Sequence, residues 1–335
     1  MIAGGFGTGY TLGDNRVGMD PPVKALFVCA SNPAVSIPHQ TKVLRGLSRD
    51  DLFTVVVEHF LTDTTRYADV VLPATMAIEH RDLLIAYGHL YVAWNEPAVP
   101  PPGDCLPTTE IFRRLARTMA LDEPALYDSD ETMACQLLES GHPSLIGISL
   151  DTLKERGSIR LNYLDPFVPF ATSFPTASGR LEFVSDRMAQ VGLDPVAGYT
   201  PSYEAAQDDT ALAREYPLAL VTPANHSFLN SIFANVPQQL RRSGAATLLI
   251  HPEDAAPRRI GAGDGVRVAN ARGSFVAVAD VSDRIRQGVV ATTKGHWPRD
   301  AKEGTTVNAT VDERDSDMGG GAVYHDNRVR VDRTC

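Results

Sequence analysis

The first third of the chain alternates between unbroken apolar runs and polar segments with helical spacing. The apolar runs show no polar–apolar alternation, which is typical of strands in a parallel sheet covered on both faces. Three such runs are predicted strands: KALFVCA (24–30), LFTVVVEHF (52–60) and DVVLPA (69–74). Between the first two, HQTKVLRGL (39–47) has the spacing of a helix that turns Val43, Leu44 and Leu47 inward.

The segments between these elements predict how they connect. SNPAVSIP (31–38) is expected to be a loop, because proline interrupts it twice. Thr62 or Asp63 is expected to cap a short helix through Tyr67. Strands and helices alternate over residues 24–74, so we predict an α/β fold with right-handed crossovers.

The middle of the chain gives weaker signals. Residues 79–108 are rich in proline and are predicted to be irregular. TEIFRRLARTMAL (109–121) predicts an amphipathic helix, and residues 130–140 predict another. The apolar stripe of the first helix consists of Ile111, Phe112, Leu115 and Met119. LEFVS (181–185) is strand-like, and the polar AQDDTALARE (206–215) is typical of a linker.

The pattern changes to short strands and tight turns after residue 216. Four segments predict strands: YPLALVTPA (216–224), TLLIHP (247–252), GVRVANARGSFVAVADVS (265–282) and GVVATT (288–293). Residues 269–274 of the third segment predict a hairpin turn between two alternating strands. So many short strands favour closure into a small β-barrel.

Composition excludes several classes of protein. The chain has 335 residues, of which 43% are hydrophobic and 21% charged, and its net charge of −10 argues against a nucleic-acid surface built on bulk positive charge. No apolar run is long enough to span a membrane, and the N-terminus lacks the layout of a signal peptide, so we predict a cytoplasmic protein. The four cysteines form no CxxC pair, which argues against an internal iron–sulfur cluster.

Two polar residues follow the predicted strands at the edge where open parallel sheets bind nucleotides. Glu58 ends the second strand, and its carboxylate could accept hydrogen bonds from a ribose diol or a guanine edge. Asn32 follows the first strand and offers a donor and an acceptor. A solvated strand end and a turn-capping asparagine are the alternative interpretations.

A second polar cluster lies in the loop TPANHSFLN (222–230). Its members are Thr222, Asn225, His226, Ser227 and Asn230. Such a cluster suits recognition of a polar heterocycle and phosphate, whereas nucleophilic catalysis would need a carboxylate beside the histidine. A loop that satisfies its own backbone is the alternative. Further on, Asp254 is expected either to cap a helix or to point at a base.

Taken together and in order, several segments resemble the molybdopterin oxidoreductases of the dimethyl sulfoxide reductase family. The first group, in residues 21–121, is PPVKALFVCASNPA, LFTVVVEHFLTDTTRYADVVLPA and PPPGDCLPTTEIFRRLA. The second, in residues 179–331, is GRLEFVS, PLALVTPANHSFLNS, IHPEDA, GAGDGVRVANARG, VNAT and GGGAVYHDN.

The resemblance implies a fold and a cofactor. A partial Rossmann-like domain is expected in residues 1–125, a connector in 126–215 and a double-psi-type β-barrel in 216–333. The implied cofactor is a bis-molybdopterin guanine dinucleotide whose dithiolenes hold molybdenum, and the implied chemistry is two-electron redox by transfer of oxygen atoms or hydride equivalents.

The resemblance also implies roles for individual residues. Asn32 and Glu58 would bind a guanosine end, and the loop 222–230 would hold pterin and phosphate. The remaining positions, which would lie near the cofactor or close over it, are His80, Asn308 and His325. Leu106 and Thr108 stand where the family has a basic residue and Asn or Asp, which puts one guanine contact in question.

The family's molybdenum ligand and iron–sulfur cysteines precede the matched region. We therefore expect this chain to act as the C-terminal portion of such an enzyme. Its partners would be an N-terminal half or subunit that carries the metal ligand, and electron-transfer subunits. Alone it should be inactive, and prone to poor solubility or self-association. A catalytically inert cofactor-binding or assembly module is the alternative; the missing glycine fingerprint disfavours a nicotinamide-dependent dehydrogenase.

Overall fold

A computed structural model describes residues 22–205, 210–316 and 320–334 of the chain. The chain divides into two compact units. The first comprises Met1–Val56, Leu61–Val70 and Phe183–Cys335, and the second comprises Val57–Phe60 and Val71–Glu182. The boundaries predicted at residues 125 and 215 rest on sequence pattern and stay a prediction.

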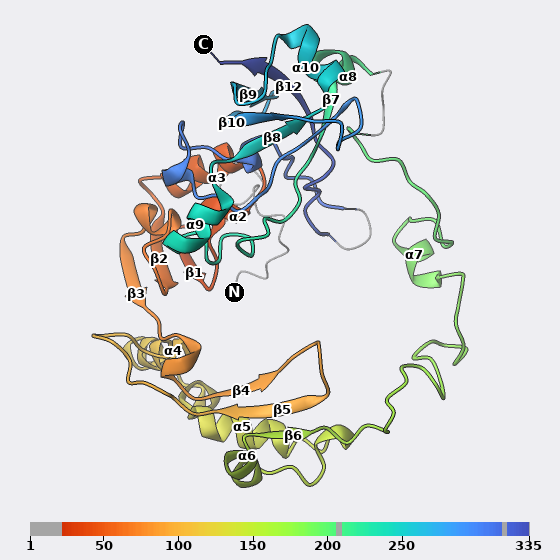
Figure 1. Cartoon of the computed structure of the whole chain (residues 1–335). Helices are drawn as coiled ribbons and strands as arrows, with labels where there is room; N and C mark the ends of the chain where they lie inside the picture. The colour runs from red at the N-terminus through yellow and green to blue at the C-terminus, as the bar shows by residue number, and fades with distance from the viewer. Residues whose placement is uncertain (1–21, 206–209, 317–319, 335) are drawn as a thin grey trace. The chain divides into compact units, whose positions relative to one another are not determined.

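The N-terminal elements form a three-stranded sheet in the order β1-β2-β3 (Figure 1). They are β1 (Ala25–Cys29), α2 (Pro33–Ser36), α3 (Gln40–Leu47), β2 (Phe53–Glu58), η1 (Thr64–Tyr67) and β3 (Val70–Pro73). All three predicted strands are confirmed. In α3, Val43 and Leu47 are buried and Leu44 packs against the same core, as the helical spacing predicted.

Two local predictions were wrong here. Residues 31–38 are not all loop, because Pro33 begins the four-residue helix α2, and the first helical position needs no N–H from proline. Asp63 stands at the N-cap of η1, but its side chain makes no capping bond. Its carboxylate instead accepts hydrogen bonds from the backbone N and the Nε of Arg299, at 3.1 and 3.2 Å.

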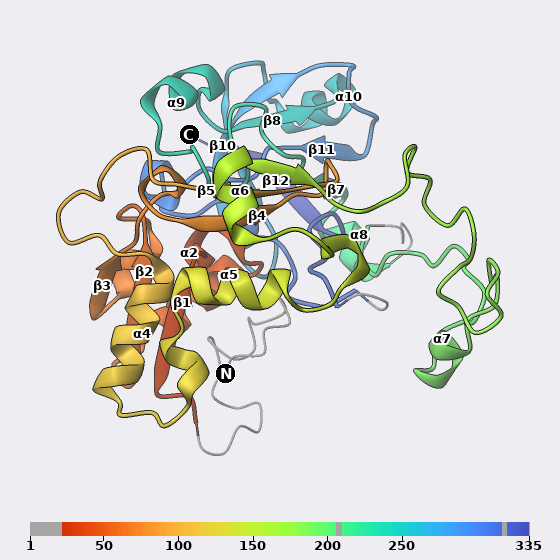
Figure 2. The same ribbon diagram turned by 90° about the horizontal axis from the view of Figure 1, so that it is seen from below.

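Six later strands close into the predicted barrel, in the order β10-β8-β11-β7-β12-β9 (Figure 1; β11 is labelled in Figure 2). They are β7 (Leu218–Val221), β8 (Thr247–Ile250), β9 (Gly265–Ala269), β10 (Ser274–Val281), β11 (Val289–Ala291) and β12 (Arg328–Arg333). Strands β10 and β8 run parallel, as do β11 and β7, and the other neighbours are antiparallel. Buried and partly exposed residues alternate along β10, so one face of each strand fills the barrel core.

Short helices connect the barrel strands and precede them. They are α7 (Asp186–Gln190), α8 (Ala211–Glu215), α9 (Pro237–Ser243), α10 (Pro252–Ala255), η5 (Ala256–Arg258), η6 (Pro298–Asp300) and η7 (Val307–Ala309). The predicted linker 206–215 therefore ends in helix α8, whose N-terminus is capped by Thr210; residues 206–209 lie outside the described part. The strand predicted for LEFVS (181–185) is not formed, because the only pairing described there is an isolated bridge between Val184 and Val196. Phe183 in this segment is 80% exposed.

The second unit contains its own three-stranded sheet, in the order β4-β5-β6 (Figure 1). Its elements are η2 (Ala77–Glu79), β4 (Asp82–Ile85), β5 (Tyr91–Asn95), α4 (Thr108–Thr118), η3 (Pro124–Tyr127), α5 (Asp130–Leu138), η4 (Pro143–Leu145), α6 (Leu150–Arg156) and β6 (Ser158–Arg160). The prediction that residues 79–108 are irregular is therefore wrong, because strands β4 and β5 lie within them. The hairpin β4–β5 forms because Val92 and Trp94 pack into a core with Leu138 and Leu153.

Helix α4 confirms the predicted helix but not its buried stripe. Ile111 is buried, yet Met119 is 59% exposed and Phe112 41%. Arg113 is buried instead and pairs with Glu110 and Asp130. Spacing identifies an apolar face, but the neighbours that would cover it are set by tertiary structure. In the described part of the chain, no helix is both long and apolar enough to cross a membrane.

Truncation of a side chain in the barrel core should lower the free energy of unfolding strongly. Leu248 is fully buried in β8, so Leu248→Ala should lower the free energy of unfolding by about 2–5 kcal/mol through lost burial and a residual cavity. Urea denaturation at equilibrium measures this. Leu164→Ala is the control, because Leu164 is 76% exposed and should change stability by less than about 0.5 kcal/mol. Equal losses in the two variants would contradict the assigned core.

Candidate cofactor-binding site

Helix α2 is held by side chains from outside it. A four-residue helix cannot satisfy its own terminal carbonyls. The carbonyls of residues 34, 35 and 36 accept hydrogen bonds, in that order, from Gln40 Nε2, Asn308 Nδ2 and Tyr324 Oη, each at 2.7 Å. Asn308 lies in η7 and Tyr324 lies ahead of β12, so the helix is docked on segments that belong to the barrel.

Asn32 stands at the start of this helix with one half of its amide in use. Its Oδ1 accepts a hydrogen bond from Thr64 Oγ1 at 2.7 Å, and the same hydroxyl accepts one from the backbone N of Ala34 at 3.1 Å. Its Nδ2 is buried and has no partner among the described residues. The protein therefore orients the amide through its oxygen and leaves a donor unused.

In Asn308 the amide nitrogen is bonded and the oxygen is not, which is the reverse of Asn32. Its Nδ2 donates to Val35, and its Oδ1 is buried without a partner among the residues that the structure describes. Buried polar atoms are nearly always bonded, so Asn32 and Asn308 each keep hydrogen-bonding capacity that a ligand could use. A heterocycle with adjacent donor and acceptor atoms, such as the amide edge of a pterin or guanine, fits this pair.

The loop 222–230 uses part of its polar cluster internally. Thr222 donates its backbone N–H to His325 Nδ1 and its hydroxyl to the carbonyl of Tyr324, both at 3.2 Å. Asn225 donates to Ser243 and Thr293 and accepts from the backbone N of Ser227 at 2.7 Å. These two residues shape the loop, as the alternative interpretation proposed.

The rest of the cluster is more accessible. His226 and Asn230 are exposed, and Ser227 is half-buried. Asn230 has a φ of +49°, so the loop turns sharply at this point. The imidazole of His325 is also exposed while it accepts the hydrogen bond from Thr222. These side chains can reach a ligand above the loop.

Asp254 has a structural partner. It is buried in α10, and its Oδ2 accepts a hydrogen bond from the backbone N of Gly288 at 2.7 Å, just ahead of β11. The carboxylate thus binds the protein's own backbone, and contact with a base stays a prediction.

Glu58 and His80 belong to the second unit. Glu58 Oε1 accepts a hydrogen bond from the backbone N of His59 at 2.7 Å. His80 Nδ1 lies 2.9 Å from Thr75 Oγ1, and its ring borders a cavity of about 410 Å³ with Arg81, Trp94 and the start of α4. Their expected roles at the cofactor stay predictions.

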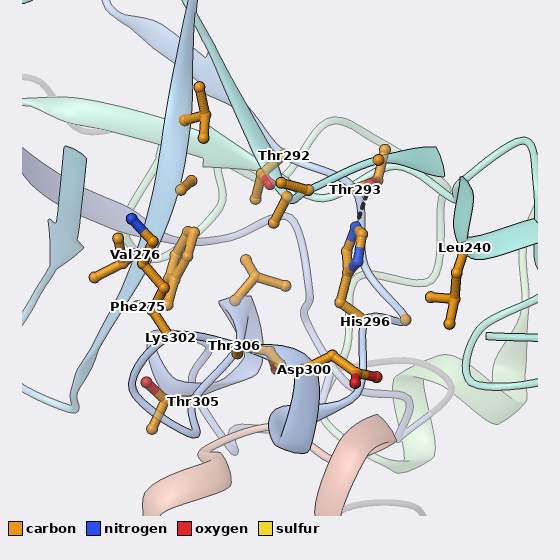
Figure 3. A pocket seen from close by; sticks show the side chains of 18 residues that line it. Leu240, Phe275, Val276, Thr292, Thr293, His296, Asp300, Lys302, Thr305 and Thr306 are labelled. Carbon is orange, nitrogen blue, oxygen red and sulfur yellow. Dashed lines mark hydrogen bonds between the residues drawn. The ribbon is translucent and has the colours of Figure 1, made fainter. Parts of the chain in front are cut away.

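A cavity on the barrel flank is lined by Thr292 and His296, among other polar residues that the sequence did not single out (Figure 3). It has a volume of about 140 Å³ and is bordered by β10, the end of α9 and residues 292–307. Thr292 Oγ1 is buried without a partner among the described residues. Burial lowers the pKa of His296, although Asp300 opposes the shift, so its imidazole is neutral at pH 7. Gly295, with a φ of +100°, lets the same loop pass close to Asn230.

Two family models match the chain. Residues 9–118 match the Molybdopterin oxidoreductase model, and residues 218–328 match the Molydopterin dinucleotide binding domain. Over 315 residues the chain is 37% identical to "Probable oxidoreductase YoaE" of Bacillus subtilis (strain 168), covering 94% of this chain and 45% of that protein. This chain belongs to the dimethyl sulfoxide reductase family of molybdopterin oxidoreductases.

Other relatives agree with this assignment. Identity is 26% over 348 residues to "Dimethyl sulfoxide reductase DmsA" of Escherichia coli (strain K12), covering 94% of this chain and 42% of that one. Acetylene hydratase from Pelobacter acetylenicus shares the fold, with a TM-score of 0.76 at 21% identity, over 94% of this chain and 44% of that structure. The chain thus spans a little under half the length of the relatives it matches.

The predicted family is confirmed, and a bis-molybdopterin guanine dinucleotide with molybdenum is the cofactor of this family, as predicted. The unused atoms of Asn32 and Asn308 fit such a group by their chemistry. Among the described residues, no three His, Cys, Asp or Glu side chains gather so as to hold a metal ion.

The neutral imidazole of His296 predicts a dependence of stability on pH. Because its pKa in the folded chain is lowered from 6.5, the unfolded chain takes up the proton first as the pH falls. The free energy of unfolding should therefore decline from about pH 6.5 down to the lowered pKa and level off below it. His296→Gln should flatten this slope in urea titrations at stepped pH. Part of the slope should remain, since burial also lowers the pKa of His39. An unchanged slope would count against a buried, neutral His296.

Proposed function

We propose that this chain binds the dinucleotide portion of a molybdopterin guanine dinucleotide and forms the C-terminal part of an oxidoreductase. When bound, the cofactor supplies two-electron redox chemistry at molybdenum, by transfer of oxygen atoms or hydride equivalents. The observation that carries the proposal is the pair of half-used amides, of which Asn32 directly precedes α2 and Asn308 donates to a carbonyl of that helix. In this role the chain's own residues bind and orient the cofactor and keep water from its polar edge.

The topology supports the finer fold labels. Strands β7, β8 and β9 have counterparts in β10, β11 and β12, because β7 lies parallel to β11 as β10 lies parallel to β8, and β9 and β12 pair with each other. This internal two-fold repeat favours a double-psi-type barrel at residues 216–333. The β1-β2-β3 sheet, with helices between its strands, is assigned to a partial Rossmann-like domain.

We further propose that an N-terminal half or subunit supplies the metal ligand, that electron-transfer subunits complete the enzyme, and that the isolated chain is inactive and cytoplasmic.

The chain should be expressed alone and together with the N-terminal part of a relative, and bound guanine nucleotide and molybdenum should be measured by mass spectrometry. Absence of both from the co-expressed complex contradicts the proposal. Nucleotide binding without turnover in the complex favours the inert assembly module instead.

Asn32→Asp isolates the ligand-facing half of one amide. The substitution keeps the Oδ1 that accepts from Thr64 and replaces the unused donor by an acceptor. We expect the Kd for a fluorescent N-methylanthraniloyl derivative of GDP to rise about tenfold. The lost hydrogen bond and the repulsion between the carboxylate and an acceptor of the ligand should together cost about 1.4 kcal/mol of binding free energy. Because Asn32 is only 6% exposed, the added carboxylate should also lower the midpoint of thermal unfolding, so binding is measured well below that midpoint.

Gln238→Glu is the matched control for the added charge. Gln238 is exposed in α9 of the same unit, so this variant carries the same net charge without touching α2. Its affinity should equal that of the wild type. If Asn32→Asp binds the nucleotide as tightly as Gln238→Glu, the donor of Asn32 does not face the ligand.

A further inference from the structure

Gln40 is a fully buried polar side chain with both ends of its amide in use. It is the first residue of α3 and has no exposed surface. Its Nε2 donates to the carbonyl of Ala34 at 2.7 Å, and its Oε1 accepts from the backbone N of Thr306 at 2.8 Å. The hydroxyl of Thr306, labelled in Figure 3, lies 3.4 Å from the same oxygen. One side chain therefore joins α2 to the turn that enters η7.

Packing alone does not explain a glutamine at this position. Glutamine is rarely buried completely, since its amide loses its bonds to water, and an apolar side chain of similar volume would fill the space at lower cost. What the amide adds is direction, because both of its hydrogen bonds are short and end on fixed backbone atoms. The glutamine thus sets the distance between two backbone segments.

These two segments are the ones that carry the half-used amides. Asn32 directly precedes α2, and Ala34 is the second residue of that helix. Asn308 is two residues beyond Thr306, within η7. A shift of α2 relative to Thr306 would change the position of the Asn32 donor relative to the Asn308 acceptor.

We infer that Gln40 is a positioning residue for the cofactor site: it fixes α2 against the Thr306–Asn308 turn, so that Asn32 Nδ2 and Asn308 Oδ1 face one ligand in register. This inference rests on the proposed function. Gln40 itself makes no contact with the cofactor. Loss of the glutamine amide should weaken binding while the fold persists.

The fold should survive the change because other bonds hold the same segments. Tyr324 donates to the carbonyl of Ser36 at 2.7 Å, and the backbone N of His39 donates to the carbonyl of Val311 at 3.0 Å. Lys42 pairs with Glu313 at 2.8 Å across the same junction. These contacts keep α2 and α3 on the barrel, while the local register loosens.

Gln40→Met tests the inference, because methionine fills nearly the same volume and makes neither hydrogen bond. In the full chain, we expect the Kd for the fluorescent GDP derivative to rise about tenfold. Backbone amides of residues 33–37 and 306–310 should also exchange with deuterium faster in the nucleotide-free protein. Gln40→Glu should bind weakly at pH 8 and regain affinity as the pH falls, because only the protonated carboxyl can donate to Ala34.

Val43→Ala is the control for stability. Val43 is fully buried in α3 but faces the core of the sheet, so its truncation should lower the unfolding midpoint at least as much as Gln40→Met and leave the affinity for nucleotide unchanged. If Gln40→Met binds as the wild type does, or if Val43→Ala loses the same affinity, the positioning role is overturned. A wild-type chain that binds no nucleotide overturns the proposed function itself, and that result is read from the wild type alone.

Discussion

Helix α2 has more backbone carbonyls than it can satisfy, and much of the first unit is arranged around that constraint. A helix of four residues has no independent stability, since nucleation costs more than one turn returns. Each carbonyl left unpaired in a buried position would cost about 1–3 kcal/mol. Gln40, Asn308 and Tyr324 remove three such penalties. The helix exists in this place because side chains outside it cap it, two of which, Asn308 and Tyr324, are distant in sequence.

The closed barrel makes this capping possible. All six strands are paired on both sides, so the segments that leave the barrel start from fixed points. Asn308 and Tyr324 both lie on segments that join β11 to β12, and Thr222 ties the loop after β7 to the carbonyl of Tyr324. The polar groups of the loop 222–230 divide accordingly. Thr222 and Asn225 hold the loop in shape, which leaves His226 and Asn230 exposed on a fixed frame.

The sequence predicted the elements whose signal is local. Each of these elements has its own pattern: a β-branched run in β2, helical spacing in α3, and polar–apolar alternation in β9 and β10. The barrel was predicted from the number of short strands. Predictions failed where tertiary contacts decide. The sequence of the β4–β5 hairpin is irregular by local pattern, and the hairpin forms because Val92 and Trp94 pack into a core. The apolar stripe on α4 does not indicate which neighbours cover it.

For the site, the sequence suggested Asn32 by its place after the first strand and by resemblance to the family, and Asn308 only through that resemblance. No local pattern could indicate that each amide would have one atom bound and the other unused, since that depends on Thr64 and Val35. Gln40 and Thr292 carried no sequence signal at all. A single glutamine in an amphipathic helix is ordinarily a surface residue, and only its complete burial sets it apart.

The polar atoms that this site leaves open are uncharged, which limits what they can do. A neutral amide gives a hydrogen bond a direction but adds little attraction for the diphosphate of a dinucleotide. The chain carries a net charge of −10, so long-range attraction of an anionic cofactor does not come from the chain as a whole. In the proposed function, the half-used amides would orient the heterocycle, and the cations that balance the phosphates would have to be local. Lys294, whose Nζ lies 5.1 Å from the centre of the Tyr324 ring, is one cation that the barrel holds beside the residues that dock α2.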